Sequence, residues 1–154
     1  MEHSLMRSAR LFARLRRAVF ARHSNPWSAW SRWLTAPVVL VPVWTRSRRH
    51  AVVVGVWFAL NPVVFPAPAD QRAWATRAML GEELWIVARP KDAALAVNAA
   101  ATGAGLVALV AARRRRPVPA GAATVAQMLL LLVYWELMAR YFEAHRDAGE
   151  GCWS

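Results

Sequence analysis

The chain has 154 residues, enough for one domain, and a formal net charge of +11, with 19 arginines and a single lysine, Lys91. Hydrophobic residues make up 57% of it, above the roughly 45–50% of soluble domains. The arginines are clustered between long apolar runs, which favours an anionic membrane over a nucleic acid as their partner, and the one cysteine, Cys152, excludes a disulfide within one chain.

Residues 1–25 are predicted to form a basic amphipathic helix that lies on an anionic membrane surface. Apolar side chains recur at steps of seven, three and four, and arginines occupy much of the rest: Leu5, Phe12, Leu15 and Val19 against Arg7, Arg10, Arg14 and Arg17. The segment lacks the continuous apolar core of a signal peptide. A solvated tail is the alternative interpretation.

Residues 26–143 are predicted to form a transmembrane domain, followed by a polar tail over 144–154. Four apolar runs in this domain are expected to cross the membrane as helices, at about 29–45, 51–65, 93–112 and 120–141. The run 93–112 carries no charge and is the clearest of the four. The run 51–65 has 15 residues, against about 20 for a perpendicular span, so 29–65 is either two full spans or a re-entrant hairpin.

Tryptophans mark the start of the first run. Trp27, Trp30 and Trp33 step by three along the chain, so they lie near one face of a helix. We expect them to form an interfacial belt, with Arg32 reaching back to the lipid headgroups. Packing of these rings into a soluble core is the alternative.

Residues 70–88 are predicted to form an amphipathic helix that lies in the membrane interface, with Asp70 as its N-cap. One face repeats at steps of four, three and four, through Trp74, Ala78, Gly81 and Trp85. Glu82 and Glu83 diverge on the helix, so they are a poor pair for acid–base chemistry. Together with Arg77 they are interpreted as its water-exposed side.

Two arginine-rich links, residues 46–50 and 113–116, join the apolar runs in pairs and are expected to lie among the headgroups. With four spans, both termini share one side of the membrane. That side carries 13 basic residues and the other carries seven. The positive-inside rule therefore predicts a multi-pass protein of the cell membrane with both termini in the cytoplasm.

No strong catalytic motif is present: the chain has no P-loop, no nucleotide-binding glycine pattern, no GxSxG and no HExxH. Its four histidines are scattered, so neither a metal site nor a cofactor is predicted. Glu136 and Arg140 are four residues apart and can pair along one helix face, as an anchor or as part of a functional site. The topology brings the remaining candidates to one side of the bilayer, as a candidate functional face of Trp27, Trp30, Arg32, Asn61, Trp74, Arg77, Glu82, Glu136 and Arg140.

Three segments resemble a family of small prokaryotic membrane proteins of unknown function. They are residues 25–32 (NPWSAWSR), residues 61–62 (NP) with 65–68 (FPAP), and residues 74–82 (WATRAMLGE). The resemblance covers residues 23 to about 143, with the basic N-terminal helix as an extra. It implies a multi-spanning membrane protein and supplies no activity or ligand.

These observations predict an all-α integral membrane bundle of about four transmembrane helices with interfacial amphipathic helices. The leading hypothesis is a non-enzymatic accessory or scaffold subunit. The alternatives are an oligomeric small transporter or channel with Glu136 or Asn98 along its route, and an interfacial lipid-modifying enzyme that uses Glu82 or Glu136. The expected partners are a lipid bilayer with anionic headgroups and a second copy or another membrane protein, with no nucleic acid.

Overall fold

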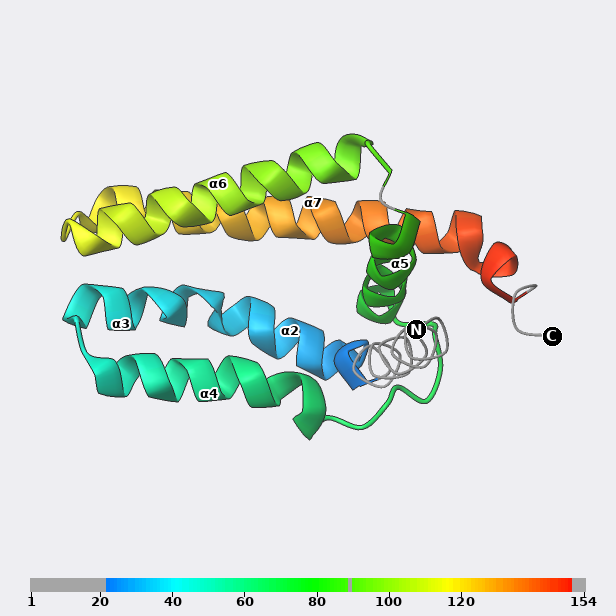
Figure 1. Ribbon diagram of the computed structural model, residues 1–154, viewed down its shortest axis with the longest axis horizontal. Helices are drawn as coiled ribbons and strands as arrows, with labels where there is room; N and C mark the ends of the chain where they lie inside the picture. Colours follow the sequence, from blue (N-terminus) through cyan, green and yellow to red (C-terminus); the bar gives the residue numbers. More distant parts are fainter. Residues whose placement is uncertain (1–21, 89, 151–154) are drawn as a thin grey trace, which may run out of the picture.

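The computed structural model describes residues 22–88 and 90–150, and within these ranges the chain is helical and contains no strand (Figure 1). The predicted N-terminal helix lies mostly outside the described residues. The helices are α2 (Pro26–Thr35), the 3-10 helix η1 (Ala36–Val39), α3 (Leu40–Thr45), α4 (Arg48–Val64), α5 (Trp74–Ala88), α6 (Ala93–Arg113) and α7 (Pro117–Glu150).

Side-chain caps set the starts of three helices. The side chain of Asn25 accepts a hydrogen bond from the backbone N–H of Trp27, and Pro26 occupies the first turn of α2. Ser47 caps α4 and Asp92 caps α6 in the same way. Because each cap satisfies a free backbone N–H of the first turn, it fixes where the helix begins.

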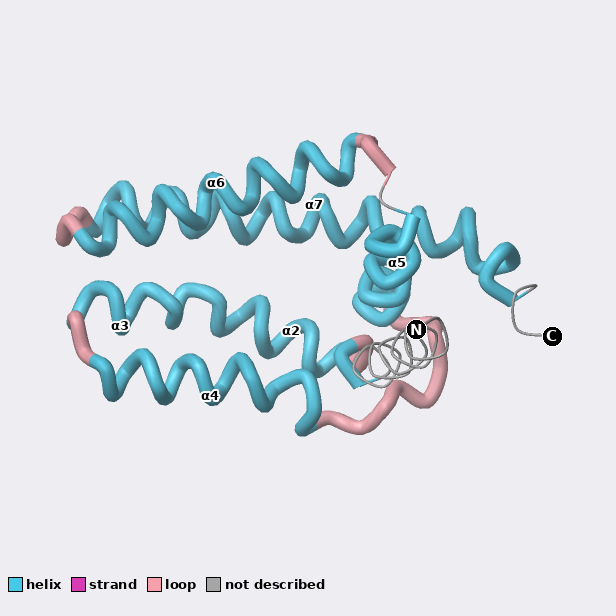
Figure 2. The backbone as a smooth tube through the Cα atoms, viewed as in Figure 1, coloured by secondary structure: helices cyan, strands magenta, loops and turns pink. Residues whose placement is uncertain are grey.

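The helices form two hairpins that lie side by side, joined at one end by α5 (Figures 1 and 2). The first hairpin pairs α2, η1 and α3 with α4, and the second pairs α6 with α7. Each hairpin turns through an arginine in the left-handed region, Arg46 with φ 55° and Arg115 with φ 58°. Both turns lie at the same end of the molecule, which we call the tips, and the predicted arginine-rich links are located there.

The first predicted span is not one continuous α-helix. A 3-10 segment, Ala36–Val39, separates α2 from α3, and Pro37 lies in its first turn. Proline has no N–H for the helical ladder and its ring crowds the preceding turn, so the chain tightens here. The second helix, α4, in contrast continues through Pro62 to Val64.

The helix expected over 70–88 begins only at Trp74, and Asp70 does not cap it. Asp70 instead accepts a hydrogen bond from the backbone N–H of Arg72 in the turn before the helix. α5 is also buried on more than one face, because it lies between α2 and α7. α5 therefore packs between the two hairpins. The prediction that one of its faces is apolar and the other faces water does not describe this position.

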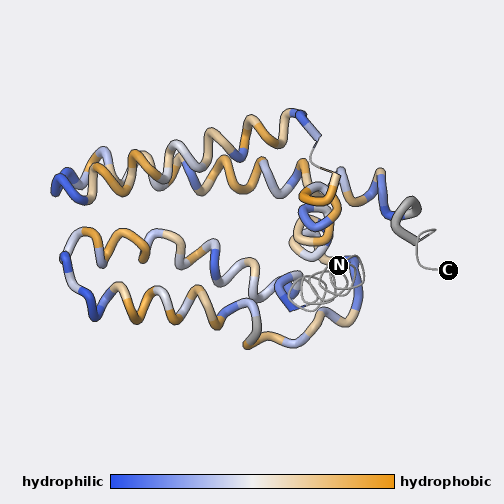
Figure 3. The backbone as a smooth tube through the Cα atoms, in the orientation of Figure 1, coloured by the Kyte–Doolittle hydropathy of each residue, from blue (hydrophilic) through white to orange (hydrophobic). Residues whose placement is uncertain are grey.

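α7 is longer than the predicted span of 120–141, since it runs from Pro117 to Glu150. The first seven residues of the predicted polar tail, 144–150, thus continue the helix. α6 and α7 are long and apolar enough to cross a membrane, judged by length and composition. Apolar residues follow all the helices of both hairpins, and polar residues gather at the tips (Figure 3).

Candidate functional site

The candidate site lies at the end of the bundle opposite the tips, where α5 meets α2 and α7. We call this region the head. It is built around four tryptophans from three helices: Trp30 and Trp33 of α2, Trp74 of α5 and Trp135 of α7. The Trp30 ring centroid lies 5.9 Å from that of Trp74 and 5.6 Å from that of Trp135. These are favourable edge and tilted contacts, so the tryptophans hold the two hairpins together.

Beside the tryptophans lies a cavity of about 240 Å³, which we call the charged cavity because Arg32 and Glu82 both line it. Arg32 donates from Nε to the Ser28 carbonyl at 3.1 Å and from Nη2 to the His23 carbonyl at 3.3 Å. Its guanidinium also contacts the His23 ring, which lines the cavity as well. Glu82, which also lines the cavity, accepts at its Oε1 a hydrogen bond of 3.1 Å from the Tyr134 hydroxyl.

A second polar network joins α4 to α2. Asn61 is fully buried, and its Oδ1 accepts a hydrogen bond from Ser28 Oγ at 2.9 Å. Its Nδ2 donates to Ser31 Oγ at 2.8 Å. In addition, Asn25, the cap of α2, donates from Nδ2 to the carbonyl of Pro66, just after α4, at 3.0 Å. Side-chain amides of two asparagines therefore join the start of α2 to the end of α4.

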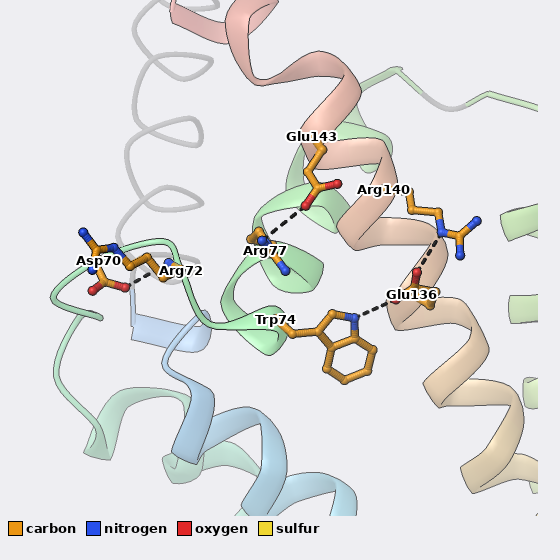
Figure 4. A network of polar contacts seen from close by, with 7 residues as sticks. All are labelled: Asp70, Arg72, Trp74, Arg77, Glu136, Arg140 and Glu143. Carbon is orange, nitrogen blue, oxygen red and sulfur yellow. Dashed lines mark hydrogen bonds and ion pairs between the residues drawn. The ribbon is translucent and has the colours of Figure 1, made fainter.

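A third network crosses the outer side of the head (Figure 4). Glu136 of α7 accepts hydrogen bonds from Trp74 Nε1 at 2.8 Å and from Arg140 Nε at 2.7 Å. Arg77 of α5 pairs with Glu143 of α7 at 3.2 Å. These side chains are partly or largely exposed, so each ion pair contributes little stability by itself, about 0–1 kcal/mol.

Burial shifts the pKa of two groups at the charged cavity. Burial and, in smaller measure, the positive charge of Arg32 together lower the pKa of His23 to about 4. Burial raises the pKa of Glu82, while the hydrogen bond from Tyr134 and the charge of Arg32 oppose that rise. The cavity therefore holds a neutral imidazole, a guanidinium and a carboxyl group whose proton is held more tightly than usual.

The His23 shift predicts a pH dependence of stability. Because the folded-state pKa of about 4 lies below the ordinary 6.5, the unfolded chain binds the proton more tightly. Stability is therefore fully present above about pH 6.5 and falls as the pH drops toward 4. We expect the melting temperature of His23→Gln in detergent to fall less than that of wild type over this window. Glu82 acts in the opposite direction in both proteins, so the difference between the two curves isolates His23; parallel curves would contradict the assignment.

Most of the candidate residues chosen from the sequence meet in the head. The tryptophan cluster and the three polar groupings described above contain Trp30, Arg32, Asn61, Trp74, Arg77, Glu82, Glu136 and Arg140. Trp27 does not join them, since it is 73% exposed. Sequence reasoning missed His23, Ser28, Ser31, Tyr134 and Trp135. Ser28 and Ser31 lie inside the NPWSAWSR segment, which was a signal for them, and His23 lies two residues before it.

The chemistry available in the head is limited. Within residues 22–88 and 90–150, no group of three His, Cys, Asp or Glu side chains could hold a metal ion. Glu136, the carboxylate proposed for a transport route or a reaction, is held by Trp74 and Arg140 outside the charged cavity. Glu82 lines the charged cavity, together with the imidazole of His23 and the guanidinium of Arg32.

Comparison with known proteins identifies a family. The profile of a family of unknown function, DUF6653, matches residues 5–112. The matched region starts before the expected residue 23 and ends before α7, so it includes most of the N-terminal segment that was expected to be an extra. No curated protein and no solved structure matches the chain.

Proposed function

The chain belongs to the DUF6653 family of unknown function, and from this premise we propose that it is a four-span integral membrane protein without enzymatic activity, acting as a scaffold or accessory subunit. The observation that carries the proposal is the apolar surface of both hairpins. Val52, Val53, Val107 and Leu129 are each more than half exposed, and no other helix in the described part of the chain covers them. Hydrocarbon is the solvent that suits such a surface.

The helix lengths support four crossings. At about 1.5 Å per residue, the 17 residues of α4 reach about 26 Å and the 21 residues of α6 about 32 Å, close to the roughly 30 Å of hydrocarbon. The segment from Pro26 to Thr45 is of similar reach. Both arginine-rich tips would then lie in one headgroup layer, and the head in the other.

The head supports a scaffold role because its polar side chains join helices to one another. Asn61 of α4 binds Ser28 of α2. Two contacts join α5 to α7, namely Trp74 with Glu136 and Arg77 with Glu143. With more basic residues on the head side than at the tips, we place the head and both termini in the cytoplasm. The basic surfaces on both sides suit anionic headgroups, and a second copy or a membrane partner would pack on the exposed hairpin faces.

An interfacial lipid-modifying enzyme is the second candidate. One observation favours it: Glu82 and His23 line the same cavity, so a carboxyl group and a second titratable group lie together at the expected membrane interface. Release of a headgroup or an acyl chain from lipid vesicles by the purified protein, absent in Glu82→Gln, would support it. If the wild-type protein releases neither a headgroup nor an acyl chain, the lipid-modifying hypothesis is wrong and the non-enzymatic role stands.

Cysteine labelling tests the four crossings. We replace Cys152 with serine and introduce single cysteines by Arg48→Cys, Ala69→Cys, Arg114→Cys and Ala144→Cys, all at exposed positions. A membrane-impermeant maleimide applied to sealed vesicles of known orientation is expected to label residues 48 and 114 from one side, and residues 69 and 144 from the other.

Each position must react after the vesicles are opened with detergent, which controls for buried thiols. A re-entrant or peripheral first hairpin predicts a different result, because residue 48 would react from the same side as residue 69 or only after opening. Either of these outcomes would overturn the four-span proposal and leave at most α6 and α7 as crossings.

A further inference from the structure

A second cavity, of about 390 Å³, lies between the two hairpins and shares two lining residues with the charged cavity. We call it the hairpin cavity. Ala36 of η1 and Phe58 of α4 line both spaces, so the two cavities are neighbours. The larger cavity alone falls within the roughly 300–1,000 Å³ of small-molecule sites. The hairpins that enclose it lie side by side in Figure 1.

The hairpin cavity is mainly apolar. Its walls include Val39, Leu40, Leu106 and Leu109. The two threonines in the lining use their hydroxyls within their own helices, since Thr102 donates to the Asn98 carbonyl and Thr124 to the Ala120 carbonyl. Among the lining residues, only the Gln127 side chain presents a polar amide to the space. Such a cavity suits a hydrocarbon chain better than a polar solute.

The charged cavity is also lined mainly by apolar side chains, but it carries two ionisable groups of opposite kind. Arg32 and Glu82 line it and act on each other electrostatically, yet within residues 22–88 and 90–150 no carboxylate lies close enough to Arg32 for an ion pair. A guanidinium and a carboxyl group that line one open cavity without a direct ion pair suit a ligand that carries both charges itself, because the ligand's cation would favour the ionised form of Glu82. The ligand's anion would bind the guanidinium and its cation the carboxylate.

We propose that the two cavities together bind one phospholipid whose headgroup carries a primary ammonium. Its phosphate lies at Arg32, its ammonium donates to Glu82, and one acyl chain passes Ala36 and Phe58 into the hairpin cavity. An anionic headgroup would meet the Glu82 carboxylate, and a choline headgroup has no N–H to donate to it. This inference rests on the proposed membrane-spanning function, because the lipid must enter sideways from the bilayer between the hairpins.

Lipid preference of the purified full chain tests the headgroup assignment. Phosphatidylethanolamine, phosphatidylglycerol and phosphatidylcholine with identical acyl chains are added to protein in detergent, and the retained lipid is counted by native mass spectrometry. We expect wild type to retain the ethanolamine lipid about tenfold more than either other lipid. Glu82→Gln should lose this preference, because the amide keeps the volume and the bond from Tyr134 but not the charge. Glu136→Gln, the same change outside the cavity, should keep it.

A block inside the hairpin cavity tests the acyl-chain assignment. Thr102→Phe, at a residue that lines the hairpin cavity and not the charged cavity, is expected to reduce retention of phosphatidylethanolamine about tenfold. It should leave unchanged the rise in melting temperature that glycerophosphoethanolamine, the headgroup without chains, produces at high concentration. Ala99→Phe, on an exposed part of α6, adds the same ring outside both cavities and should bind as wild type does.

Wild type that holds the glycerol or choline lipid as tightly as the ethanolamine lipid overturns the proposal, whatever the variants do. So does a Glu82→Gln protein with an unchanged preference. These failures are distinct from that of the four-span proposal, which is decided by labelling at residues 48 and 69 and not by lipid retention.

Discussion

Replacing Gly81 with alanine is expected to destabilise the protein more than the same change at Gly55, Gly103, Gly105 or Gly121. A Cβ at this position would lie 1.9 Å from the Met138 carbonyl oxygen and 3.2 Å from the Phe142 Cβ. The first of these atoms belongs to the backbone of α7, so it cannot rotate away as a side chain does. We expect α5 to separate from α7, with a loss of about 3 kcal/mol in the free energy of unfolding.

The measurement is the melting temperature in detergent of Gly81→Ala compared with Gly103→Ala. Gly103 lies in α6, and a Cβ there would meet nothing within 4 Å. Alanine is favoured over glycine inside a helix by about 0.5–1 kcal/mol, so Gly103→Ala should melt at or above the wild-type temperature. If Gly81→Ala has the same melting temperature as wild type, α5 does not lie against the backbone of α7 at Met138.

Replacing Asn61 with alanine is expected to have the second largest effect. The change removes both side-chain hydrogen bonds that join α4 to α2, at a position that is fully buried. Ser28, also fully buried, would retain only its longer contact of 3.4 Å with the residue 61 carbonyl. A buried polar group without a partner costs about 1–3 kcal/mol, and the lost side chain leaves a void besides. We expect a total loss of about 2 kcal/mol or more.

A double-mutant cycle with Ser28→Ala measures the contact itself. If the Ser28–Asn61 bond joins the helices, the double variant should be less destabilised than the sum of the single variants, by about 0.6–1.7 kcal/mol as found between membrane helices. Ser31→Ala provides a second cycle through the Nδ2 bond. Strictly additive effects in both cycles would show that Asn61 stabilises the head through packing and not through these hydrogen bonds.

Features fixed by neighbours along the chain could be predicted from the sequence. The third apolar run, expected at 93–112, is α6 from Ala93 to Arg113, because Asp92 caps its start and arginines follow its end. The contact of Glu136 with Arg140 follows from the four-residue spacing of a helix, and it is present at 2.7 Å. All-helical architecture follows likewise from apolar runs separated by proline and charge.

Features that join distant parts of the chain could not be predicted in this way. Periodicity shows that Trp30 and Trp74 each lie on an apolar face, but not that these faces meet, 44 positions apart, as a tilted pair. His23 was interpreted as one of several scattered histidines. Its place in the candidate site follows from its contact with Arg32, which only the folded chain brings about. Pro37 lies at the break Ala36–Val39, but a proline in the sequence indicates a bend and does not specify a 3-10 helix.

The length of α7 has a consequence for the space next to the membrane. Its 34 residues reach about 51 Å at 1.5 Å per residue, well beyond the roughly 30 Å of hydrocarbon. If the helix leaves the bilayer near Tyr141, the nine residues to Glu150 extend as a rigid spacer of about 13 Å. Glu143, paired with Arg77 of α5, braces the base of this spacer. A partner that binds at the far end of this spacer would be held at a fixed distance from the lipid surface. A flexible tether of the same length would allow that distance to vary.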